Sequence, residues 1–130
     1  MPKIHAAFAS LVTFAVLLGL LGGSPCKAAD ALKPVYTADE TKEFKTLATA
    51  TLAALDAQNE KEMVAKITDL ETAWDAKEDT LKPKDPPTWT AIDKTLDKAI
   101  SAIRGSKPDL KKGKAALESL VKKLDEATKP

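Results

Sequence analysis

The sequence predicts an all-α protein: an antiparallel up-down-up-down four-helix bundle that follows a cleaved signal peptide. Apolar residues recur every three or four positions in four consecutive segments, which is typical of amphipathic helices. Capping residues, prolines and glycines separate these segments by short turns. The chain has 130 residues, 44% of them hydrophobic, and this length and composition suit one compact domain. No stretch shows the two-residue alternation of a strand.

Residues 1–28 have the pattern of a secretory signal peptide. Lys3 supplies the positive start, an apolar run extends from Ala6 to Leu21, and small residues precede a cleavage site after Ala28. We therefore expect export to the periplasm. Two alternatives are an uncleaved membrane anchor and a lipoprotein acylated at Cys26, although Pro25 is the wrong residue before an acylated cysteine.

The predicted signal peptide holds the only histidine and the only cysteine of the chain, His5 and Cys26. The processed protein would then lack the two side chains that most often act as nucleophile or base near neutral pH. The formal net charge of +1 does not favour nucleic-acid binding. We expect a protein that is not an enzyme and does not bind nucleic acid, with no membrane span in the processed chain.

The remaining chain divides into an extended, loosely packed lead-in (29–36), the bundle (37–127) and a short tail (128–130). Thr37 and Glu40 have the spacing of a capping box, which predicts a helix start. The apolar stripe of this first helix consists of Phe44, Leu47, Ala48, Leu52 and Leu55.

The second helix is predicted to begin at Asn59, with Glu62 three residues later as in the first helix. Proline-rich residues 81–87 end it, because proline cannot continue a helix. Its stripe consists of Met63, Val64, Ile67, Leu70 and Trp74, with Leu81 as a further candidate.

The third helix is predicted to start with Asp85 as cap and Pro86 as first residue, and to end at Gly105 in a left-handed conformation. The fourth follows Pro108 and contains Gly113, which costs about 1 kcal/mol relative to alanine. Their stripes are Trp89, Ile92, Leu96, Ile100 and Ile103, then Leu110, Leu117, Leu120, Val121 and Leu124.

Two stretches, Ile92–Ile100 and Lys114–Leu120, resemble the acid-rich third helix and alanine-rich fourth helix of the periplasmic b-type cytochrome bundle. That family binds haem through a methionine on the first helix and a histidine on the last, and this chain has neither. We therefore expect no haem. The run Glu71–Asp75, followed by Trp89 and Asp93, is similar to small exported helical-bundle proteins of proteobacteria, a resemblance that implies no known activity.

Two pairs of acids follow core positions of the second and third helices: Glu71 with Asp75, and Asp93 with Asp97. If these flanks face each other in an antiparallel pair, the four carboxylates converge; with the opposite handedness they point apart. Converging carboxylates would suit a hard divalent cation or iron. The alternative is a solvated flank neutralised by nearby lysines, namely Lys66, Lys77, Lys94 and Lys98.

Trp74 and Trp89 flank the proline-rich turn, where they either plug the end of the core or line an apolar pocket. Three functions are therefore open. The first is a small periplasmic binding or interaction protein without catalysis, whose partner is an unknown periplasmic protein or small ligand. The others are a metal-binding accessory protein that uses the four carboxylates, and a carrier of a small apolar ligand.

Overall fold

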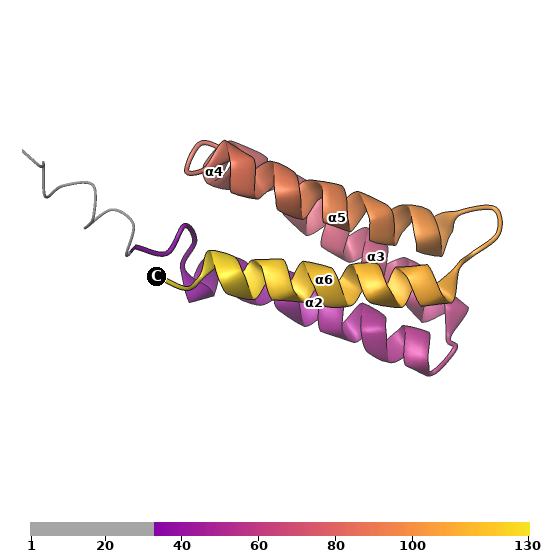
Figure 1. Cartoon of the computed structure of the whole chain (residues 1–130). Coiled ribbons are helices and arrows are strands. Elements are labelled where there is room, and N and C mark those ends of the chain that lie inside the picture. Colours follow the sequence, from indigo (N-terminus) through magenta and orange to yellow (C-terminus); the bar gives the residue numbers. More distant parts are fainter. Residues whose placement is uncertain (1–32) are drawn as a thin grey trace, which may run out of the picture.

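The computed structural model describes residues 33–130, so the predicted signal peptide and the first residues of the lead-in lie outside the described residues. The described chain is an all-α bundle of four long helices and one short helix (Figure 1). The elements, labelled as in Figure 1, are α2 (Ala38–Asp56), α3 (Glu60–Asp75), α4 (Glu78–Leu81), α5 (Pro86–Arg104) and α6 (Leu110–Ala127).

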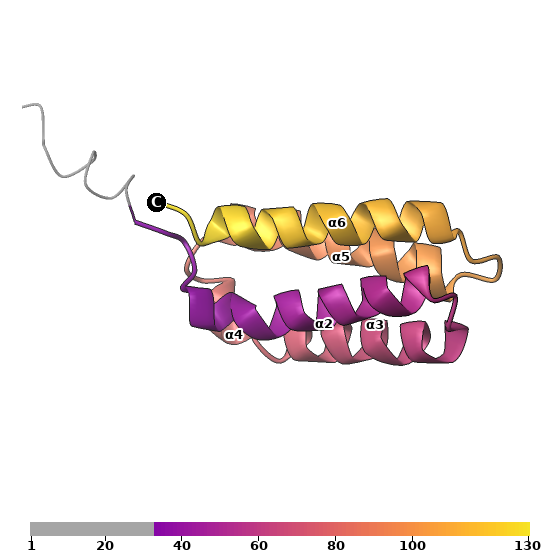
Figure 2. The same cartoon turned by 90° about the horizontal axis from the view of Figure 1, so that it is seen from below.

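Successive long helices run in opposite directions and form two layers, with α5 and α6 in one and α2 and α3 in the other (Figure 2). The contacts between α2 and α3 and between α5 and α6 are the most extensive. Contacts of α2 with α6 and of α3 with α5 join the two layers. Of these four pairs of neighbouring helices, α3 and α5 make the least extensive contact. Within residues 33–130, no helix is both long and apolar enough to cross a membrane.

The predicted starts of the first two helices are confirmed. The Glu40 amide donates to Thr37 Oγ1 at 3.2 Å, and the Thr37 amide donates to Glu40 Oε2 at 2.9 Å, which completes the capping box. At the start of α3, the Glu62 amide donates to Asn59 Oδ1 at 3.2 Å. Each bond satisfies an amide that the first turn of a helix leaves without a partner.

The ends of α3 and α5 differ from the prediction. α3 stops at Asp75, and Leu81 reaches the core from the separate turn α4. Gly105 has φ −62° and ψ 160°, so the predicted left-handed cap is wrong. The glycine is required for another reason: a Cβ there would lie 2.7 Å from the carbonyl oxygen of Ser101, closer than van der Waals contact allows.

The left-handed residue of the chain described here is Gln58, with φ 54°. It follows α2 in a Schellman arrangement, in which the Asn59 amide donates to the Ala54 carbonyl at 2.9 Å and the Gln58 amide to the Leu55 carbonyl at 3.0 Å. A side chain in this conformation carries a steric cost that glycine avoids.

We expect Gln58→Gly to raise the free energy of unfolding by about 0.5–1 kcal/mol, because it removes this cost at an exposed position. Urea denaturation followed by circular dichroism measures the change. Ala57→Gly is the matched control, since Ala57 lies in the right-handed region and its replacement should destabilise. An unchanged or lower stability of Gln58→Gly would contradict the prediction.

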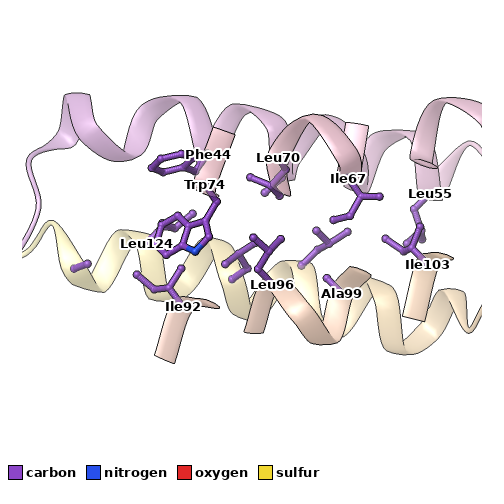
Figure 3. Packing of buried hydrophobic residues seen from close by; sticks show 14 of the residues in the cluster. Phe44, Leu55, Ile67, Leu70, Trp74, Ile92, Leu96, Ala99, Ile103 and Leu124 are labelled. Atoms are coloured by element: carbon purple, nitrogen blue, oxygen red, sulfur yellow. The ribbon is translucent and has the colours of Figure 1, made fainter. Parts of the chain in front are cut away.

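A single apolar core runs along the axis of the bundle, and its side chains come from all five helices (Figure 3). Tyr36, expected in a loosely packed lead-in, is only 1% exposed, and its amide donates to the Ala127 carbonyl at 3.0 Å. The start of the described chain is thereby fastened to the end of α6. Thr41 and Thr51 also lie in the core, with hydroxyls that donate to carbonyls of the preceding turn of α2 or its cap.

Candidate functional site

The four carboxylates predicted to converge lie along the α3–α5 seam, and one of them forms an ion pair. Glu71 Oε2 lies 2.7 Å from Arg104 Nη2, and Arg104 Nη1 also donates to Thr68 Oγ1 at 3.3 Å. Both partners of the ion pair are about one-third exposed. Arg104 therefore links the end of α5 to the middle of α3 and neutralises Glu71.

Arg104, the only arginine of the chain, was not predicted as a partner of these acids. Its spacing from Asp97 could have indicated this role. Arg104 follows Asp97 by seven residues, two helical turns, which places both on one flank of α5. The lysines considered instead lie nearer in sequence, but none of them forms an ion pair with the four acids within residues 33–130.

Asp93 is also engaged. Its Oδ1 accepts a hydrogen bond from Trp74 Nε1 at 3.0 Å, which satisfies the polar atom of a side chain that is 1% exposed. The Trp74 indole stacks on Trp89 with ring centroids 3.8 Å apart and planes 9° from parallel, and Phe44 packs edge-on at 5.1 Å. Figure 3 shows Trp74 beside Phe44 within the apolar core.

Asp75 is the carboxyl whose pKa the neighbouring acids of the seam change most clearly. Slight desolvation raises its pKa first, and the negative charges of Glu71, Asp93, Glu78 and Asp97 raise it further. The four acids therefore share one electrostatic environment. Within residues 33–130, however, no group of three or more histidine, cysteine, aspartate or glutamate side chains is arranged to hold a metal ion. The carboxylates lie on a common flank without forming a coordination sphere.

The tryptophan pair occupies the space in which a pocket was considered. The two rings are in face-to-face contact, and Trp89 is only 3% exposed. A ligand could enter between them only if the rings separated, which would break the stack and expose apolar surface. The arrangement suits the alternative interpretation, in which the tryptophans plug the end of the core.

A large concavity lies elsewhere, on the outer surface between α5 and α6, and was not identified from the sequence. We call it the lysine groove. It is open to solvent and encloses about 800 Å³. Its lining residues are Thr95, Asp97, Lys98, Ser101, Ala102, Lys107, Asp109, Lys112, Ala115, Ala116, Ser119 and Lys123.

The groove exists because small side chains let α5 and α6 approach closely. Ala99, Ala102 and Ala116 lie at or next to this interface, and Gly113 lies against Ile103. A Cβ at Gly113 would meet the Ile103 side chain at 3.1 Å. The glycine that the sequence presents as a weak point in the helix is therefore a packing site. Short side chains continue to the outer surface and leave a trough between longer lysines.

Cations outnumber anions around the groove. Asp109 already has a partner: its carboxylate accepts a hydrogen bond from the Lys112 amide at 3.0 Å, which lowers the pKa of Asp109. The same carboxylate lies 3.2 Å from Lys112 Nζ. In the part of the chain that the structure describes, Lys98, Lys107 and Lys123 form no ion pair. Their positive charge is balanced within the groove only by Asp97.

Searches against protein-family models, curated proteins and solved structures return no match for this chain. The function must therefore be argued from the two features described above, the acidic α3–α5 seam and the lysine groove.

Proposed function

We propose that the protein is a small periplasmic interaction protein that binds a partner through its outer surface and catalyses no reaction. The proposed location is based on the signal-peptide pattern of residues 1–28. The lysine groove is the observation that carries the binding function, because it combines a large concavity with three lysines that form no ion pair within residues 33–130.

The contacts of the acidic seam support a structural role for these groups. Glu71 is paired with Arg104, and Asp93 holds the indole of Trp74 in the core. General acid–base catalysis needs two groups of contrasting environment within reach of one substrate. Here, two of the four carboxylates are engaged in contacts between helices, which favours a role in positioning α3 against α5.

Photo-crosslinking in the natural host tests the proposed function. A photoreactive amino acid replaces Ala115, an exposed groove residue on α6, or Thr72, an exposed residue on α3 that serves as control. We expect a discrete adduct from position 115 after irradiation of cells and none from position 72. Equal adducts from both positions, or none from either position at native expression, would contradict binding through the groove.

Metal binding at Glu71, Asp75, Asp93 and Asp97 is the alternative, favoured by the raised pKa of Asp75 among like charges. We expect Ca²⁺, Mn²⁺ and Fe²⁺ to leave the thermal unfolding midpoint unchanged, because Arg104 already compensates Glu71. A cation at 100 times its dissociation constant would add about 2.7 kcal/mol. An upward shift that Asp75→Asn abolishes, and that the control Asp69→Asn leaves intact, would instead favour the metal-binding protein.

A further inference from the structure

The lysine groove has the dimensions of a helix-binding site. On α6 it runs from Lys112 to Lys123, and the eleven residue steps between them span about 16 Å, or three turns. Its floor contains Ala102, Ala116 and Ser119, whose short side chains allow another helix axis to come near. Distances between packed helix axes depend directly on such side chains.

The openness of the groove favours a macromolecular occupant over a small molecule. Small-ligand sites bury most of the ligand surface in a concave cavity. The lysine groove is open to solvent along its outer side, so a compact ligand would keep much of its surface in water. An elongated partner that covers the whole trough would bury the floor and bring its own flanks beside the lysines on both rims.

The lysines along the rim of the groove indicate which charge the flanks of that partner should carry. Lys98 lies on the α5 side, Lys123 on the α6 side, and Lys107 in the loop between the helices. All three lack an ion-pair partner within residues 33–130. The acids that line the groove are Asp97 and Asp109, and Asp109 is paired with Lys112. A helix with acidic residues on both sides of a small apolar stripe would complement these positions and would be attracted over a distance.

We propose that the lysine groove receives an acidic amphipathic helix of a partner protein, about three turns long, as a fifth helix against α5 and α6. This inference rests on the proposed function and specifies the class of partner. The bound helix would place alanine or leucine residues against the floor and glutamate or aspartate residues beside Lys98 and Lys123.

A synthetic peptide tests this proposal. The probe is a fluorescently labelled helical peptide of about 16 residues, long enough to hold a helix, with alanine and leucine in one stripe and glutamate on both flanks. We expect its fluorescence anisotropy to rise on titration with the purified protein. A version with glutamine in place of every glutamate should bind at least about tenfold more weakly, and added salt should weaken the binding.

Protein variants assign the binding to the groove. The triple variant Lys98→Gln, Lys107→Gln, Lys123→Gln should weaken binding about tenfold, whereas a control of equal charge change outside the groove should not. The control replaces exposed lysines that do not line the groove: Lys42→Gln, Lys61→Gln and Lys77→Gln. Ser119→Trp should block the floor and abolish binding, whereas Thr72→Trp, also at an exposed helical position, should not.

Several outcomes would overturn the proposal. They are absence of binding by the glutamate peptide, equal binding by the glutamine peptide, equal losses in the two triple variants, and unchanged binding by Ser119→Trp. Direct binding of a small anionic amphiphile such as dodecyl phosphate, measured by isothermal titration calorimetry, with no peptide binding, would assign the groove to another ligand. If position 115 still forms an adduct in cells while the peptide does not bind, the proposed function stands and the proposal of an acidic partner helix is wrong.

Discussion

Replacing Trp74 with alanine is expected to lower the free energy of unfolding by about 3–5 kcal/mol. The indole is 1% exposed, stacks on Trp89, meets the edge of Phe44 and donates to Asp93. Its removal leaves a cavity where α3 and α5, the loosest pair of neighbouring helices, are held together. Because domains of this size are stable by about 5–15 kcal/mol, this loss is a substantial part of the total stability.

Trp74→Phe separates the packing contribution from the hydrogen bond. Phenylalanine keeps an aromatic ring beside Trp89 but provides no donor for Asp93, so we expect a smaller loss of about 1–2 kcal/mol. Urea denaturation of both variants, followed by circular dichroism, measures the two losses. A loss below about 1 kcal/mol for Trp74→Ala would show that the α3–α5 contact does not depend on this side chain.

Tyr36 is expected to make the protein less stable in alkali. Its ring is 1% exposed and its hydroxyl has no hydrogen-bond partner within the described chain. Burial raises the pKa of this hydroxyl from 10.0 to about 12, and the negative charges of Asp85 and Glu40 add to the effect. Between these pH values the unfolded chain loses the phenolic proton while the folded chain keeps it. Stability is therefore complete below pH 10 and falls as the pH rises toward 12, by roughly 2–3 kcal/mol.

Tyr36→Phe removes both the buried hydroxyl and its titration. We expect the variant to be more stable at neutral pH by about 1 kcal/mol, because an unsatisfied polar group leaves the core. It should also lose the tyrosine-dependent fall in stability between pH 10 and 12. Chemical denaturation at pH 7, 10 and 11 measures both effects. A less stable variant at pH 7 would show that the hydroxyl forms a bond in solution.

The titration can be observed directly, because Tyr36 is the only tyrosine of the chain. The ultraviolet absorbance of tyrosinate therefore reports a single site. We expect the folded protein to titrate near pH 12 and the urea-unfolded protein near pH 10. Coincident titration curves would contradict the burial of this side chain.

The helices could be predicted from sequence because their signals are local. The capping box at Thr37 and Glu40, the Asn59 cap and the Asp85–Pro86 start depend on residues within one turn, and each begins a helix where expected. The polar core positions could not be found in this way. Thr41 and Thr51 are hydrophilic by type, and they enter the core because their hydroxyls bond to backbone carbonyls of the same helix or its cap.

The candidate sites were harder to predict because they depend on which flanks face each other. The acids of α3 and α5 were placed on a common seam from their spacing, but the pairing of Glu71 with Arg104 needed the register of the two helices. The lysine groove depends on several short side chains, together with Gly113, that bring α5 and α6 together. From the sequence alone, the short side chains are ordinary helix residues, and Gly113 is a residue that destabilises its helix.

The most direct test of binding through the groove compares the cross-linked adduct from position 115 in two charge variants in cells. One carries glutamine at Lys98, Lys107 and Lys123, and the other at Lys42, Lys61 and Lys77, and circular dichroism confirms that both variants are folded. We predict that the adduct is lost in the first variant and retained in the second. Equal adduct yields in both would show that the lysine groove does not recognise the partner.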